Sequence, residues 1–177
     1  MRKILGIICL FAAVGCAHLN PDYTVRIEDC ADRIVSEIAK GLEGTYSGKS
    51  ILVSTPVNAV TYATSDFGLV LQGFLIGSLV KENVPVIDVQ LREEPHITSE
   101  GALVFLNRDA GRLRSEFKAE LVIVSAYVVR EQEVVITVRA IDLAEGDVVS
   151  STTTILSMST LVSDLLGARR QIQVFER

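Results

Sequence analysis

The sequence predicts a single α/β domain of the α+β type, with helices packed on a mixed sheet that ends in a three-stranded antiparallel meander. Two patterns predict this class. In the first part of the chain, apolar residues recur at a spacing of three and four, and short aliphatic runs separate these segments. Later, three successive segments alternate apolar and polar residues with a period of two, which is typical of half-buried strands.

The first predicted elements are an amphipathic helix and a short strand. Helical periodicity runs over residues 23–42, and Gly41 and Gly44 are typical helix stop signals. Residues 51–54 form an aliphatic strand, after which we expect a loop over residues 57–64.

A second helix is expected over residues 67–82, because Ser65 and Asp66 carry side-chain oxygens that can accept hydrogen bonds from the first amide groups of a helix. The pattern then predicts a strand over residues 84–89 and a third helix over residues 102–117. These elements complete the part of the chain in which helices and strands alternate.

The three strands of the meander are predicted over residues 121–129, 134–141 and 148–156, with short polar turns between them. In the middle strand, alternate residues from Val134 onward are aliphatic, so one face of the sheet needs cover. The third strand carries the polar run 150–154, which predicts a solvated edge.

Residues 1–15 have the order of an export signal. Two basic residues precede an apolar run over residues 4–14, and this run of about 11 residues is shorter than the roughly 20 that span a membrane. The segment Ala13-Val14-Gly15-Cys16 resembles a bacterial lipobox, in which the cysteine thiol receives a lipid. We therefore predict lipidation of Cys16, with an ordinary signal cut at Ala17 as the alternative.

The predicted division of the chain follows from this anchor. Residues 16–22 are the lipidated cysteine and a short tether, residues 23–166 are the folded domain, and residues 167–177 are a tail that is either an extra strand or a loose end. Because no Asp follows Cys16, the sequence does not resemble an inner-membrane retention signal. We expect an outer-membrane anchor with the domain facing the periplasm, held within roughly 20 Å of the lipid by a tether of about six residues.

Cys30 is the one cysteine expected in the mature domain, since Cys9 leaves with the signal and Cys16 carries lipid. An unpaired thiol in an oxidising compartment needs an explanation. Cys30 shares helical spacing with Ile27 and Ile34, so we predict that it is buried as a small apolar residue.

Residues 44–50, Gly-Thr-Tyr-Ser-Gly-Lys-Ser, look like a phosphate-binding loop but do not meet its requirements. Three residues separate the glycines where that loop needs four, and the segment leaves a helix rather than entering one. Removal of Arg2 and Lys3 with the signal takes the formal net charge from −5 to −7, which disfavours nucleic acid. We expect Gly44 and Gly48 to be turn residues, and neither nucleotide nor nucleic acid to be a partner.

Catalytic and metal-binding patterns are missing from the sequence. His96 is the only histidine expected in the domain, and the ligand spacing of a zinc site is not found around it. The serines have neither a Gly-x-Ser-x-Gly elbow nor a histidine base. We predict a protein that is not an enzyme and that holds no metal or cofactor.

The second helix is apolar almost all round over residues 69–80, where it contains Gly73 and Gly77. A helix without a polar face needs cover on more than one side. Two alternatives stay open: the helix is enclosed within the domain, or Gly73 and Gly77 permit the close approach of a second subunit in a homo-oligomer.

The order of motifs from about residue 50 to residue 154 resembles the FlgO domain family of flagellar outer-membrane lipoproteins. Each motif is short, and the resemblance depends on their order behind a lipobox. The matching segments are residues 57–68, which end in Ser-Asp-Phe-Gly, Val86-Ile87-Asp88-Val89, Leu106-Asn107-Arg108-Asp109, residues 121–127, Val138-Arg139-Ala140-Ile141-Asp142 and Gly146-Asp147-Val148-Val149.

This resemblance implies a non-enzymatic, lipid-anchored outer-membrane protein that is a structural or assembly component at the base of the flagellum and serves motility. It implies the membrane as one partner, through the lipid, and flagellar or outer-membrane ring proteins as others. Related folds occur in lipoproteins that activate cell-wall synthases and in curli-secretion lipoproteins, so these two roles are the alternatives.

Overall fold

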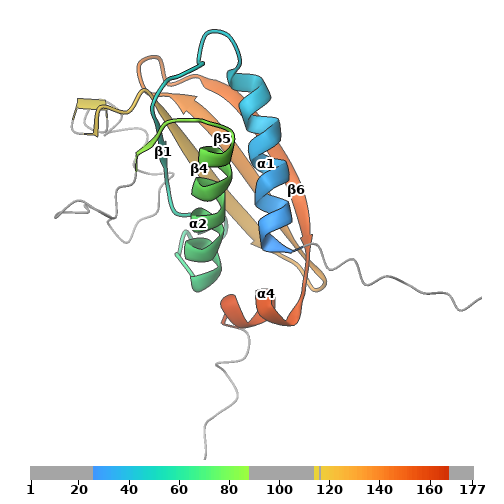
Figure 1. The fold of residues 1–177 in the computed structure, drawn as a ribbon. Coiled ribbons are helices and arrows are strands. Elements are labelled where there is room, and N and C mark those ends of the chain that lie inside the picture. Colours follow the sequence, from blue (N-terminus) through green and yellow to red (C-terminus); the bar gives the residue numbers. More distant parts are fainter. Residues whose placement is uncertain (1–25, 88–113, 116, 168–177) are drawn as a thin grey trace, which may run out of the picture.

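The computed structural model describes residues 26–87, 114–115 and 117–167. They form one α/β domain in which helices pack on a mixed six-stranded sheet (Figure 1). The elements follow one another as α1 (Ile27–Leu42), β1 (Ile51–Val53), β2 (Val57–Asn58), α2 (Asp66–Lys81), β3 (Val86–Ile87), β4 (Leu121–Val129), β5 (Glu133–Asp142), β6 (Val148–Ser157) and α4 (Thr160–Leu165).

The sheet has the strand order β3-β1-β4-β5-β6, and β2 pairs with β4 beside β1. β1 runs parallel to both β3 and β4, and Leu52 lies opposite Val122. β4, β5 and β6 are antiparallel neighbours, with Ile123 opposite Ala140 and Val138 opposite Thr152. The predicted fold class, including the antiparallel meander at its end, is therefore confirmed.

Both α1 and α2 cover the same face of the sheet (Figure 1), where they form the larger of two hydrophobic clusters. The alternation predicted for β5 is confirmed, because Val134, Ile136, Val138 and Ala140 are all buried in this cluster. The smaller cluster lies on the opposite face of the sheet and consists of Leu52, Phe117, Ala119, Val122, Val124 and Leu143.

α1 is amphipathic and presents its apolar side to the sheet. Its buried residues recur at helical spacing and include Cys30, which is fully buried as predicted. Burial raises the pKa of the Cys30 thiol, because the thiolate form is disfavoured away from water. This unpaired thiol is thus kept in its unreactive form.

Polar side chains join α1 to α2 at the rim of the core. Ser78 on α2 donates a hydrogen bond to Asp32 on α1, and the Lys81 ammonium lies 3.3 Å from the same carboxylate. The hydrogen bond from Ser78, with a further contribution from Lys81, holds the pKa of Asp32 below its usual range. These contacts fix how the two helices lie against each other.

One local prediction was wrong, and another holds only in part. Residues 57–64 are not all loop, because the chain passes from β1 along the same edge of β4 and pairs again as β2, with Val57 opposite Ala126. The polar run of β6 lies at an edge of the sheet, as predicted, but only one of its two sides is solvated. Thr152 and Thr154 are buried beneath α1, where they bond to Glu37 and Arg33.

Some predicted elements extend beyond the described residues. The strand predicted over residues 84–89 is seen as β3. In the third predicted helix, Arg114, Ser115 and Phe117 are helical, and the other residues of that helix lie outside the described part. Residues 168–177 of the predicted tail are likewise outside it. α4 was not predicted; it begins after Ser159, whose hydroxyl accepts a hydrogen bond from the Val162 amide at 3.2 Å.

Gly68 allows the first turn of α2 to lie directly against the chain between β1 and β2. A Cβ at this position would collide with the backbone carbonyl oxygen of Pro56, which cannot swing aside as a flexible side chain could. Gly73, five residues further along the same helix, has open space where a Cβ would be, with no atom from outside the helix's own nearby backbone within 4 Å.

We expect Gly68→Ala to lower the free energy of unfolding by about 1–3 kcal/mol, because the added methyl group overpacks a close contact. The matched variant Gly73→Ala should raise it by up to about 1 kcal/mol, because alanine favours a helix and meets open space. Chemical denaturation followed by circular dichroism measures both. Equal stabilities for the two variants would contradict the close contact.

Candidate functional site

α2 exposes an apolar surface on the side that points away from the sheet. Leu69, Phe74 and Val80 are 50%, 37% and 59% exposed, and Gly73 and Gly77 lie between them on the same side. We call these five residues the α2 face. Large apolar side chains gathered in this way on a helix are typical of a surface that binds another protein.

The opposite side of α2 holds the helix on the domain. Phe67, Leu71, Leu75 and Leu79 recur every four residues, and all are at most 1% exposed. The helix is therefore apolar all round although only one half of its circumference is buried within the domain. Within the described residues, Gly73 and Gly77 are exposed rather than enclosed.

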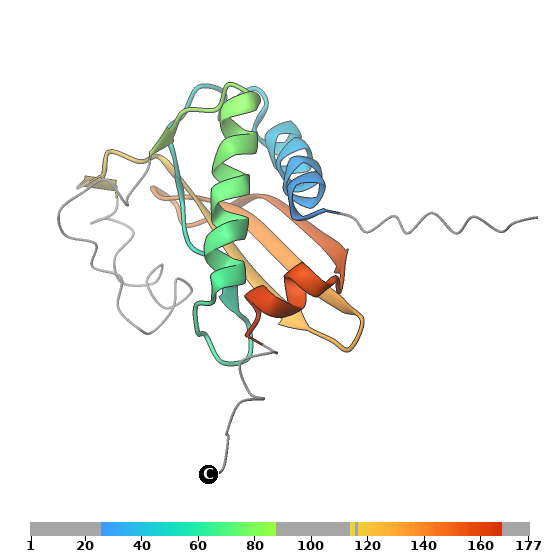
Figure 2. The same ribbon diagram turned by 60° about the horizontal axis from the view of Figure 1, so that its bottom comes forward.

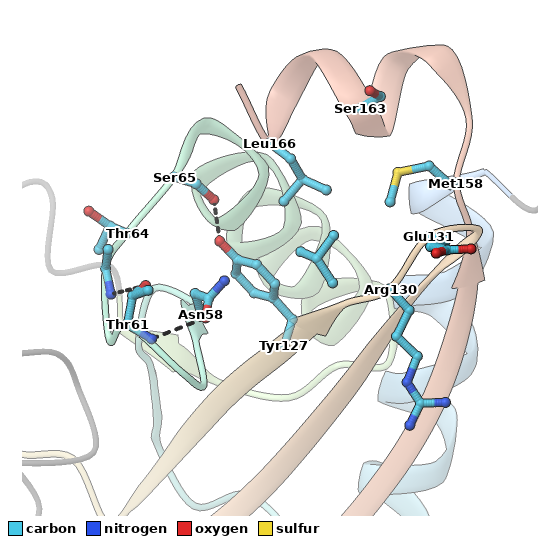
Figure 3. Close-up of a pocket in the computed structure, with 12 residues that line it drawn as sticks. Asn58, Thr61, Thr64, Ser65, Tyr127, Arg130, Glu131, Met158, Ser163 and Leu166 are labelled. Atoms are coloured by element: carbon cyan, nitrogen blue, oxygen red, sulfur yellow. Dashed lines mark hydrogen bonds between the residues drawn. The ribbon is translucent and has the colours of Figure 1, made fainter. Parts of the chain in front are cut away.

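A pocket of about 480 Å³ lies at the N-terminal end of α2 (Figure 3). One wall is the loop between β2 and α2, and the others are the β4–β5 turn and α4 with Met158, the residue that follows β6. Figure 2 shows α4 beside the first turns of α2, and the two helices are in contact. The pocket is lined by Asn58, Thr61, Ala63, Thr64, Ser65, Tyr127, Val129, Arg130, Glu131, Met158, Ser163 and Leu166.

The polar groups on the loop wall are used to hold the loop itself. Ser65 caps α2 by accepting a hydrogen bond from the Gly68 amide at 3.1 Å, and its hydroxyl lies 2.6 Å from the Tyr127 hydroxyl. The Asn58 side chain accepts hydrogen bonds from the amides of Val60 and Thr61. These hydrogen bonds hold the loop in one conformation and use part of the hydrogen-bonding capacity of its polar groups.

Tyr127 joins the pocket to the core. Its ring is 2% exposed and packs edge-on against Phe67, with 5.1 Å between the ring centroids. Arg130 extends away from Tyr127 (Figure 3) and forms an ion pair with Glu133 at 3.1 Å. The pocket thus presents hydroxyl and amide groups on one side and the aliphatic side chains of Met158 and Leu166 on the other.

The pocket contains no arrangement that would activate a nucleophile. Ser65 is paired with a tyrosine hydroxyl and a backbone amide, neither of which is an imidazole or carboxylate base. Over residues 26–87, 114–115 and 117–167, no three His, Cys, Asp or Glu side chains are placed to hold a metal ion.

Several residues singled out in the sequence can now be placed. Gly44 and Gly48 have φ values of 79° and 76° and follow α1, which confirms their role as turn residues before β1. Cys16, the predicted lipidation site, and His96 lie outside the described residues. Gly73 and Gly77 are brought together on the α2 face, whereas Cys30 is buried on the apolar side of α1.

Sequence reasoning missed the pocket and part of the α2 face. Ser65 was recognised as a helix cap, but its pairing with Tyr127 joins residues 62 positions apart and leaves no local pattern. Phe74 and Val80 could not be separated from buried residues of the same helix, because apolar residues surround the helix on every side.

The same fold occurs in solved domains of bacterial proteins. The structure is similar to the LpoB C-terminal domain from Escherichia coli, with a TM-score of 0.56, 13% identity, and coverage of 72% of this chain and 98% of that one. It is also similar to the same domain from Salmonella enterica, with a TM-score of 0.54, 14% identity, and coverage of 71% of this chain and 96% of that one. A third similar structure is lipoprotein GNA1162 from Neisseria meningitidis, with a TM-score of 0.50, 18% identity, and coverage of 68% of this chain and 92% of that one.

The chain belongs to the FlgO family. The family model, described as FlgO protein, matches residues 29–161, which run from the first turn of α1 into α4. The resemblance inferred from the order of the motifs is thereby confirmed. No match was found among curated protein sequences. Within the described residues, no helix combines the length and the apolar character needed to cross a bilayer.

Proposed function

We propose that this protein is a non-enzymatic lipoprotein of the outer membrane that acts as a structural or assembly component at the base of the flagellum and serves motility. Membership of the FlgO family supports this role. Cys16, at the end of a lipobox-like segment, would carry the lipid anchor and hold the domain on the periplasmic side of the membrane.

The observation that carries the proposal is the exposed α2 face. An exported domain gains no stability from leaving Leu69, Phe74 and Val80 partly in water: full burial of one such side chain stabilises by roughly 1.5–3 kcal/mol, and the exposed part of each forfeits the corresponding share. A protein partner that covers these residues would recover that free energy. The glycines between them leave room for the backbone or side chains of the partner to approach closely.

The length of chain between the anchor and the domain supports an outer-membrane partner. Ten residues, from 17 to 26, separate Cys16 from the start of α1, and they reach at most about 36 Å when fully extended. This reach is longer than the roughly 20 Å expected for the tether from the sequence, because α1 begins at Ile27 rather than at residue 23. The domain stays near the membrane that holds its lipid, where ring components of that membrane are within reach.

The alternative role is activation of a cell-wall synthase or participation in curli-type secretion. The likeness to the LpoB C-terminal domain concerns the fold alone, so it is compatible both with the proposed flagellar role and with these alternative roles. An enzyme on the inner membrane would have to be reached across the cell-wall mesh, for which a short tether and a compact domain are poorly suited.

We expect Phe74→Asp to impair motility towards that of a strain without the gene, because a charge on the α2 face would have to be buried in the complex. Val60→Asp is the matched control, since Val60 is 74% exposed and lies in the loop before α2 rather than on the face. Swimming assays are compared at equal protein levels in the membrane fraction. Full motility with Phe74→Asp would remove the α2 face from the proposal.

Cys16→Ser should abolish acylation and release the protein from the membrane, because serine offers no thiol for the lipid. Metabolic labelling with a fatty acid and membrane fractionation measure the two effects. If the variant remained acylated and membrane-bound, the anchor would lie elsewhere in the chain.

A further inference from the structure

The last residue of β4 directs its backbone toward the pocket at the N-terminal end of α2. The Arg130 amide donates to the Glu133 carbonyl at 2.8 Å, so the even-numbered residues of β4 bond to β5. The odd-numbered residues face β1 and β2 instead, and the Tyr127 carbonyl accepts from the Ala59 amide at 2.8 Å. Val129, which lines the pocket, therefore directs its amide and carbonyl away from β5 and toward the side of β2.

The chain beyond β2 does not bond to these two groups. After Ala59 it turns sharply, and the Tyr62 amide donates to the Asn58 carbonyl at 2.8 Å. In the part of the chain that the structure describes, neither the amide nor the carbonyl of Val129 has a hydrogen-bond partner. Val129 is 42% exposed, so its backbone can be approached from the pocket. The sheet has a free position here, of the kind to which an extended segment can add.

The other walls of the pocket offer an aliphatic surface and a further donor. Met158 and Leu166 are half-buried and line the side formed by α4. On the loop wall, the Asn58 side-chain oxygen accepts from two loop amides, which leaves the side-chain nitrogen to donate elsewhere. Figure 3 shows this side chain beside Tyr127. One extended stretch of peptide with an aliphatic side chain matches these walls.

The charge left without a counter-charge at the pocket is negative. Arg130 forms an ion pair with Glu133 at 3.1 Å. Glu131 lies in the same turn and lines the pocket, and it forms no ion pair with another residue of the described ranges. A ligand that carries Lys or Arg near its aliphatic residue is therefore favoured over an acidic one.

The pocket adjoins the α2 face. Ser65 lines the pocket and is the N-cap of α2, and the Leu69 amide donates to its carbonyl at 3.1 Å. Residues four apart are neighbours on the same side of a helix, so the α2 face begins one turn beyond the rim of the pocket. A protein that covers the α2 face has the pocket at the border of its contact area.

We infer that the protein partner of the α2 face inserts an extended segment into this pocket, where one residue pairs with the Val129 backbone as an added strand does. An aliphatic side chain of the segment packs on Met158 and Leu166, and a basic neighbour pairs with Glu131. This inference rests on the proposed function, because the segment belongs to the partner that binds the α2 face. The pocket then selects the partner by its sequence.

Photo-cross-linking of the full chain in intact cells tests whether one partner occupies both surfaces. A photoreactive residue at position 64, which is exposed and lines the pocket, should capture the same protein as one at position 74. Mass spectrometry should place the cross-link from position 64 in a segment with aliphatic and basic residues. Position 60 is the matched control, because Val60 is in the same loop and 74% exposed but does not line the pocket.

The outcomes separate this inference from the proposed function. Capture of the partner from position 74 but not from position 64 would overturn the inference and leave the role of the α2 face intact. Capture from position 64 of a different protein, or of another part of this chain, would overturn it in the same way. Failure of position 74 to capture any protein would overturn both.

Two variants of Val129 test the pairing with its backbone. Val129→Pro removes the amide, and this costs no bond to β5 because the amide faces the other way. It should lower the capture from position 64 roughly tenfold, whereas Val129→Ala keeps the amide and should have a smaller effect. Circular dichroism establishes that both variants fold. Equal capture with the two folded variants would contradict the pairing.

Variants of Glu131 leave every backbone group in place and test the charge. Glu131→Lys should lower the capture from position 64 at least roughly tenfold, because it would bring a like charge to the basic residue of the segment. Glu131→Gln should lower it less, since it removes the attraction without adding repulsion. If Glu131→Lys captured the partner as well as the unchanged chain does, a basic segment would not be the ligand of this pocket.

Discussion

The close contact between Gly68 and the Pro56 carbonyl oxygen sets the position of α2, and the position of α2 determines the surfaces of the domain. Because no Cβ intervenes, the helix begins directly against the chain that links β1 to β2. This contact fixes the rotation of the helix, so that Phe67 meets Tyr127 and the four-residue ridge from Phe67 to Leu79 faces the sheet. The α2 face then points to solvent, and the Ser65–Tyr127 bond closes one wall of the pocket.

Much of the fold could be predicted because its elements have distinct periods. α1 separates apolar from polar residues at a spacing of 3.6, and β5 separates them at a spacing of 2, so each pattern indicates both the element and its buried side. Cys30 falls on the apolar side of α1, which is why its burial could be inferred before the structure was known. The order of motifs was sufficient to indicate the FlgO family.

What could not be predicted depends on contacts between distant residues. α2 has no polar side, so its sequence carries no information about which half is buried, and the α2 face became visible only once the helix was placed. Thr152 and Thr154 look like residues of a solvated edge, but Glu37 and Arg33 of α1 bond to their hydroxyls and allow them to be buried. The two-residue β2 is too short to have a period and exists because β4 offers it a free edge.

The central claim is that a lipid-anchored domain uses the α2 face to bind a protein of the outer membrane or the flagellar base. Site-specific photo-cross-linking from position 74 in intact cells, with identification of the captured protein by mass spectrometry, tests it most directly. The account predicts capture of an outer-membrane or flagellar-base component from position 74 and not from position 60, which lies off the face. Capture of an inner-membrane cell-wall synthase from position 74, or of no protein at all, would contradict it.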